Sequence, residues 1–138
     1  MSRLDAIREA RTFEELYALI PSPRGCTGQC AASCGPIGFS TEEGRRLEAA
    51  GCHIPNIHER DILAVETCPA LVDGRCKIYE SRPTLCRIWG ASEPMPCPFL
   101  GCSVLDPLST EETEAVSWRA FELGGMPGVV EWGGVLRT

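Results

Sequence analysis

Cysteines at short spacings, held among residues that fix the backbone, constrain this chain more than any other feature. Cys68, Cys76 and Cys86 fall within nineteen residues, with an Asp73-Gly74 turn before the second and Pro83 shortly before the third. A zinc or iron–sulfur site needs thiolates that converge on one point without a large core to hold them. The sequence therefore predicts a metal site around which the rest of the chain folds.

Eight of the nine cysteines are candidate metal ligands, namely Cys26, Cys30, Cys34, Cys68, Cys76, Cys86, Cys97 and Cys102. An odd number of cysteines argues against a disulfide framework. The N-terminal residues are mixed in charge and carry no uninterrupted apolar run of the kind found in secretory signals. We therefore expect a cytoplasmic protein whose thiols stay reduced.

The first group of candidate ligands lies in a glycine-rich stretch, residues 24–39, where Cys26, Cys30 and Cys34 are four residues apart. Glycine allows a backbone to turn tightly around a metal and to point its amides at the sulfurs. The stretch is interpreted as a ligand loop. If it were helical, steps of four residues would still place all three thiols on one face.

Cys52, His53 and His58 form a second, weaker group of candidates. A Cys-His pair can complete a zinc site, and both imidazoles could equally be loop or surface residues. Cys52 could ligate, or it could be a buried thiol that packs as a small hydrophobe.

The composition excludes two kinds of partner. The net charge is −6 and Lys77 is the single lysine, which argues against a nucleic-acid surface. No stretch approaches the ~20 apolar residues that cross a bilayer, so no membrane association is expected. A chain of 138 residues is long enough for a single domain, residues 1–138.

The predicted fold is small and α+β, with short helices flanking a loop-rich cysteine-cluster core and a small β-hairpin. Capping boxes at Thr12 with Glu15, Ser40 with Glu43 and Ser109 with Glu112 each predict the start of a helix. Helices are expected over residues 3–10, 12–20, 41–50 and 109–123. Strands are expected over residues 62–65, 129–132 and 135–136, and the hairpin over 70–72 and 76–79.

The central cysteine run resembles the signature of a known family. Its motif, Cys68-Pro-x-Leu, then Gly-Arg-Cys76-x-Ile-Tyr-Glu-x-Arg82-Pro-x-x-Cys86-Arg87, is similar to that of the YkgJ-type cysteine-cluster family of zinc- or iron-chelating proteins. The resemblance covers about residues 26–102, which we take as the metal-binding core. The family opens with closely spaced cysteines ending in an adjacent pair, whereas Gly35 follows Cys34 here, and Cys52 could supply the missing thiol.

The resemblance leaves the role of the metal open. The wider group includes flagellin lysine methylases, which implies that such a cluster can sit inside an enzyme. The sequence contains no Ser-His-Asp set, phosphate-binding loop, dinucleotide fingerprint or His-Glu-x2-His motif that would indicate catalysis independently. A structural or redox-active metal module is favoured, with a protein redox partner as one candidate, and a small metalloenzyme or a purely structural zinc module is the alternative.

The choice of metal depends on cysteine context. The chain has no Cys-x2-Cys pair of the zinc-knuckle type, whereas Cys-Pro occurs at Cys68 and Cys97. These features favour an iron–sulfur cluster, such as 4Fe–4S, slightly over zinc. Arg82 and Arg87 are candidate cofactor-binding residues, since guanidinium groups would offset the thiolate charge. They could equally hydrogen-bond loop carbonyls.

Overall fold

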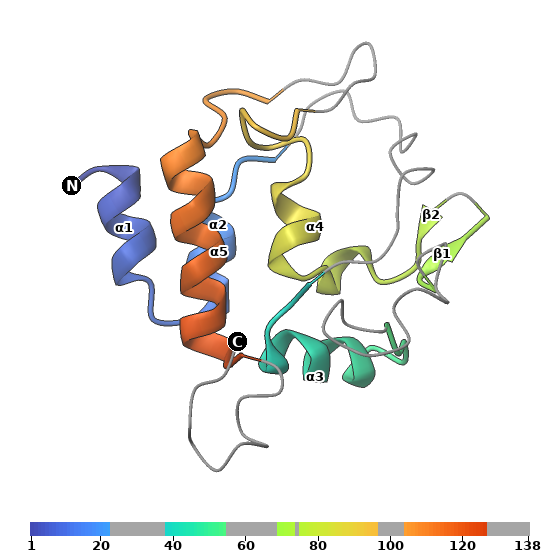
Figure 1. Ribbon diagram of the computed structural model, residues 1–138. Helices are drawn as coiled ribbons and strands as arrows, with labels where there is room; N and C mark the ends of the chain where they lie inside the picture. Colours follow the sequence, from blue (N-terminus) through green and yellow to red (C-terminus); the bar gives the residue numbers. More distant parts are fainter. Residues whose placement is uncertain (23–37, 55–68, 74, 97–103, 127–138) are drawn as a thin grey trace.

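The computed structural model describes residues 1–22, 38–54, 69–73, 75–96 and 104–126, and this part of the chain is mostly helical (Figure 1). In chain order its helices are α1 (Arg3–Glu9), α2 (Phe13–Ala18), α3 (Thr41–Ala49), the 3-10 helix η3 (Tyr79–Ser81), α4 (Thr84–Ile88) and α5 (Thr110–Gly124). One antiparallel hairpin joins β1 (Leu71–Val72) to β2 (Arg75–Cys76). Among the described helices, none is long and apolar enough to cross a membrane.

Side-chain caps start the helices where the sequence predicts them. Ser40 and Ser109 each accept the N–H three residues on, and the glutamate there accepts the serine N–H in return, which confirms both capping boxes. Thr12 also caps its helix through its side chain. The full capping box predicted there does not form, because the Glu15 carboxylate accepts the N–H of Arg11, at 2.7 Å, instead of the N–H of Thr12. Helix α1 starts with a capping box that the sequence analysis missed, formed by its N-cap serine.

The α+β prediction is confirmed in part, because the described residues are mostly helical and contain little sheet. The predicted hairpin is present, with Leu71 paired to Cys76, but each strand has two residues. Asp73 adopts a left-handed φ of 50° in the turn between them. Helix α4 was not predicted, because five residues are too few to show helical periodicity. The strands expected over residues 62–65, 129–132 and 135–136 lie outside the described residues.

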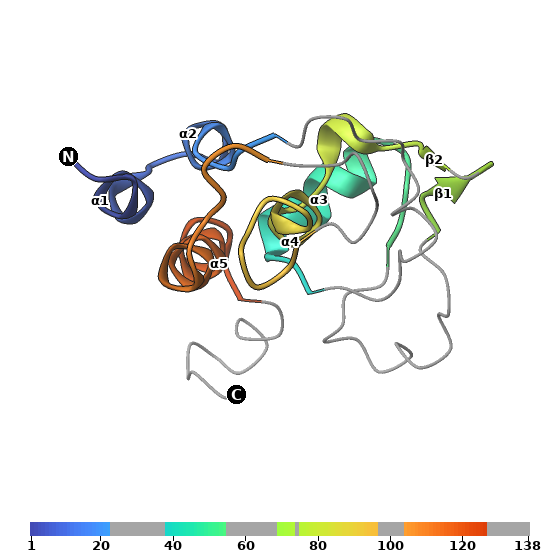
Figure 2. The same ribbon diagram turned by 90° about the horizontal axis from the view of Figure 1, so that it is seen from above.

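The main hydrophobic core surrounds α5, which contacts α1, α2, α3 and α4. Figure 2 shows α5 beside α1 and α4, with the hairpin at the opposite end of the molecule from α1. Each large apolar side chain buried in such a core contributes roughly 1.5–3 kcal/mol. The buried members of this first core are Ile7, Ala10, Phe13, Leu16, Ile20, Ile88, Ala91, Leu108, Val116 and Ala120.

A second, smaller core lies between α3 and the hairpin segment. Its buried members are Phe39, Leu47, Cys52, Ile54, Ala70 and Ile78, and Cys76 packs against it. Two described segments that carry candidate ligands pack against different cores: β2 adjoins the second core, whereas α4 inserts Ile88 into the first.

An ion pair joins the first helix to the start of the last. The Arg3 guanidinium donates from Nε and Nη2 to both carboxylate oxygens of Glu112, at 2.8 and 2.9 Å, and also to the carbonyl oxygens of Asp106 and Pro107. Chiefly through the hydrogen bond from Arg3, the pKa of Glu112 falls to about 2. The same carboxylate accepts the N–H of Ser109, so it caps α5 and holds α1 at once.

Helix α3 is anchored on the end of α5 by a close backbone approach. Thr41 donates its N–H to the carbonyl oxygen of Gly125 at 3.0 Å. A Cβ at Gly124 would collide with the Ser40 hydroxyl and would lie 2.7 Å from the Ser40 Cβ and 2.9 Å from the Phe13 ring. Glycine at this position is therefore what lets the two helices meet.

We expect Gly124→Ala to destabilise the protein by about 1–3 kcal/mol, the usual effect of adding a methyl group to a tightly packed contact. Urea unfolding, followed by circular dichroism at 222 nm, measures the change. Gly44→Ala is the matched control, since its added Cβ would meet only the edge of the Phe39 ring, at 3.1 Å, and alanine favours a helix. A Gly124→Ala variant as stable as the original protein would contradict the packing argument.

Candidate metal centre

Two of the eight predicted ligands, Cys76 and Cys86, fall within the described part of the chain, and both are half-buried. The other six lie outside it, and so does His58. Across the described residues, no three side chains of His, Cys, Asp or Glu gather closely enough to hold a metal ion. The prediction that all eight cysteines are ligands therefore stays a prediction.

Cys76 is placed by the hairpin. It ends β2, and the next residue, Lys77, donates its N–H to the carbonyl oxygen of Ala70 at 2.9 Å, which extends the pairing beyond the strands. Its side chain packs against the second core, so one side of the thiol is sheltered. The pairing with Leu71 and the hydrogen bond of Lys77 therefore position the backbone on either side of this thiol.

Cys86 is placed by helix α4. Pro83 stands at the N-cap, and Ile88 on the same helix is completely buried in the first core. The backbone carbonyl oxygen of Cys86 accepts a long hydrogen bond from Arg82 Nη1, at 3.5 Å. The helix thus carries a partly exposed thiol on a segment that is anchored through its apolar side.

Arg82 and Arg87 both bind carbonyl oxygens near Cys86. Arg82 Nε donates to Tyr79 at 3.0 Å, and its guanidinium lies 3.7 Å above the Tyr79 ring. Arg87 donates to the carbonyls of Arg82 and Glu80, at 2.7 and 2.9 Å, and stacks 3.8 Å from the Tyr17 ring. These contacts match the carbonyl-binding interpretation. A role in offsetting thiolate charge stays a prediction.

The Glu43 carboxylate lies beside the start of α4 and accepts five hydrogen bonds. One oxygen accepts from the backbone N–H and the hydroxyl of Ser40, at 3.2 and 3.0 Å. The other accepts from the Tyr17 hydroxyl at 2.7 Å, and from the N–H and hydroxyl of Thr84, at 2.5 and 2.7 Å. Glu43 is 2% exposed, and its five donors offset the cost of burying the charge. This one carboxylate joins α2, α3 and α4.

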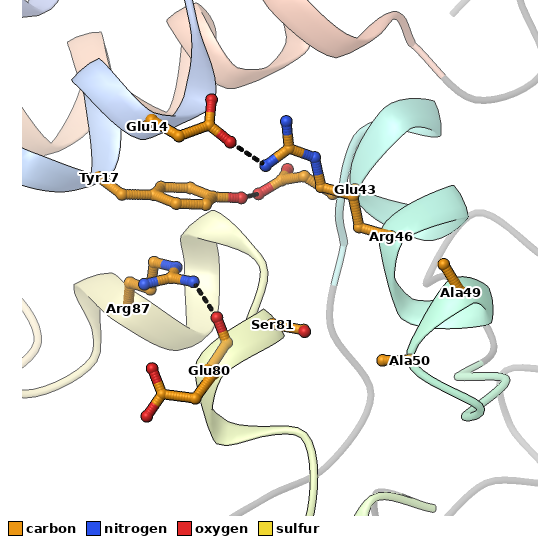
Figure 3. Close-up of a pocket in the computed structure, with 9 residues that line it drawn as sticks. All are labelled: Glu14, Tyr17, Glu43, Arg46, Ala49, Ala50, Glu80, Ser81 and Arg87. Carbon is orange, nitrogen blue, oxygen red and sulfur yellow. Dashed lines mark hydrogen bonds and ion pairs between the residues drawn. The ribbon is translucent and has the colours of Figure 1, made fainter.

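A pocket of about 520 Å³ opens beside this carboxylate (Figure 3). Burial, and then the neighbouring Glu43 charge, raise the pKa of Tyr17 well above its ordinary value, so the phenol stays protonated and donates to Glu43. The described residues that line the pocket carry both charges and include neither cysteine nor histidine: Glu14, Tyr17, Glu43, Arg46, Ala49, Ala50, Glu80, Ser81 and Arg87.

Cys52 and His53 differ sharply in environment, although they are adjacent. Cys52 is 4% exposed inside the second core, which agrees with its interpretation as a small hydrophobe. His53 is exposed, and its Nδ1 contacts the Glu48 carboxylate. A ligand role for either residue stays a prediction.

Sequence reasoning missed the second use of Glu43. The capping box with Ser40 was predicted from local spacing, but the bonds to Thr84 span 41 residues. No local sequence pattern predicts a contact between residues so far apart in the chain. The predicted capping box was nevertheless the one available pointer, because it places a carboxylate at a helix start where further donors can meet it.

The described residues fold mostly as helices and carry half-buried thiols on β2 and α4. The family model CxxCxxCC, described as "putative zinc- or iron-chelating domain", matches residues 25–119. The chain belongs to this family, as the resemblance to YkgJ-type proteins indicated. Neither the curated proteins nor the solved structures contain a match. The matched segment includes all nine cysteines, and the family description supports metal binding in general.

Proposed function

We propose that this protein holds an iron–sulfur cluster, or alternatively zinc, through the cysteines of residues 26–102, in a redox or structural role. The observation that carries the proposal is the placement of Cys76 and Cys86, half-buried thiols on two short anchored elements, inside the segment that the metal-chelating family matches. Soft thiolate donors suit both metals.

Three features of the chain support the choice of metal and its role. The two Cys-Pro contexts, at Cys68 and Cys97, and the lack of a Cys-x2-Cys pair favour iron–sulfur slightly. Cys76 adjoins the second core and Cys86 is carried on a helix of the first. A metal bound by both thiols would tie the two cores together, and such a bond contributes directly to folding.

Metal and sulfide analysis of anaerobically purified protein tests the proposal. We expect iron to co-purify with acid-labile sulfide, and the protein to be brown and to bleach in air or with dithionite. A colourless protein with stoichiometric zinc would reverse the preference between the metals. A protein that binds neither metal, even after anaerobic reconstitution, would overturn the proposed function.

A further inference from the structure

We propose that Glu43 is a positioning residue for the metal site, because its carboxylate fixes the start of α4 and so the direction of the Cys86 thiol. The inference rests on the proposed function, in which Cys86 is a ligand. It assigns Glu43 no contact with the metal. The residue acts through Thr84, two positions before Cys86 in the chain.

The first step is that α4 lacks a cap of its own. Its N-cap residue is Pro83, whose side chain makes no capping hydrogen bond. A helix start leaves backbone N–H groups without intrahelical partners, and an uncapped start typically costs about 1 kcal/mol. A helix of five residues has almost no stability in isolation. The position of α4 therefore depends on contacts from outside it.

The second step is that Glu43 supplies the missing cap from a distant part of the chain. Its Oε2 accepts the Thr84 N–H at 2.5 Å and the Thr84 hydroxyl at 2.7 Å. Thr84 is the first residue of α4, so its N–H is one of the donors at a helix start that have no partner within the helix. Thr84 is 4% exposed, so water cannot easily replace the carboxylate. Glu43 thus caps two helices at once, α3 through Ser40 and α4 through Thr84.

The third step is that the same carboxylate also reaches α4 beyond Cys86. The Tyr17 hydroxyl donates to Glu43 at 2.7 Å, and the Arg87 guanidinium stacks on the Tyr17 ring (Figure 3). Residues on both sides of Cys86 are therefore held, Thr84 directly and Arg87 through the tyrosine. Fixing the backbone on both sides of a ligand limits the directions in which its sulfur can point.

Glu112 provides a matched control elsewhere in the fold. It occupies the same position in its helix as Glu43, the third residue after a serine N-cap, and closes an equivalent capping box. Its other partner is Arg3 of α1, rather than a residue of α4. Loss of the Glu112 charge should weaken the contact between α1 and α5 while leaving the hydrogen bonds to Thr84 in place.

The test compares metal release from purified Glu43→Gln and Glu112→Gln proteins. Glutamine keeps the shape of glutamate, but its NH2 group would face donors that now meet a carboxylate oxygen. We expect metal transfer to a chromophoric chelator to be about 10–100-fold faster from Glu43→Gln, the usual effect of losing a residue that orients a ligand. Glu112→Gln should melt at a lower temperature but release metal at the original rate.

Three outcomes would overturn the inference, and they are distinguishable. If the unaltered protein holds no metal, both the proposed function and this inference fail. If it holds metal and the two variants release it equally fast, the positioning role alone fails. If Glu43→Gln does not fold, the Thr84→Val variant tests the positioning role, since it removes the hydroxyl donor and keeps the N–H. Metal release from Thr84→Val at the original rate would then reject the positioning role, and faster release would support it.

Discussion

Cys86→Ser and Cys76→Ser variants are expected to lose nearly all of their bound metal. Serine removes the soft donor, and the remaining thiolates are left without a shared ion to balance their charge. Metal content per chain, measured by elemental analysis after size-exclusion chromatography, checks the prediction.

Cys52 supplies the comparison. Because its thiol is packed in the second core, Cys52→Ala should lower the melting temperature while leaving the metal content nearly unchanged. Cys52→Ser should also keep its metal, with an added loss of stability from burying a hydroxyl. If either variant loses metal as completely as Cys86→Ser, Cys52 is a ligand and takes the place of the thiol missing after Cys34.

Removal of the metal should loosen the cysteine-bearing segments before the main helices. The first core contains ten buried residues from α1, α2, α4, α5 and their connections, and its large aliphatic side chains can sustain it without metal. The second core contains six buried residues, one of which is Cys52. It lies beside a hairpin with two residues in each strand. Small sheets of this kind need additional support to persist.

Hydrogen exchange with and without chelator measures this difference. We expect the amides of residues 69–82 to lose protection when metal is removed, and the amides of α5 to keep most of theirs. Amides of α1 serve as an internal reference, since Ile7 packs in the first core. Equal protection in both states would show that the metal contributes little to folding.

Sequence reasoning succeeded where the determinants are local. Ser40 and Ser109 identified the starts of α3 and α5, because a capping box acts over four residues. The Asp73-Gly74 pair identified the hairpin for the same reason. The fold class was predicted only in part: the hairpin is present, but the described residues are mostly helical and the helix around Cys86 was not recognised.

The site was predictable only in its chemistry. The cysteine spacings led to the metal-chelating family, and that membership is confirmed. The spatial arrangement was not predictable, because α4 owes its cap to Glu43, 41 residues away from Thr84. Arg82 and Arg87 show the same limitation: their positions in the motif were evident, but whether they bind carbonyls or face thiolates depends on tertiary contacts.

The Arg3–Glu112 pair bears on how the domain should be delimited. The family model begins at residue 25 and ends at residue 119, so it omits α1 and α2 and stops inside α5. Yet Arg3 of α1 binds Glu112 at the start of α5. Ile7 and Leu16 also pack in the same hydrophobic core as Val116. A fragment cut at the family boundaries would expose the apolar side of α5 to water. Homology marks the segment that carries the thiols, whereas the hydrophobic core that supports it extends past both boundaries.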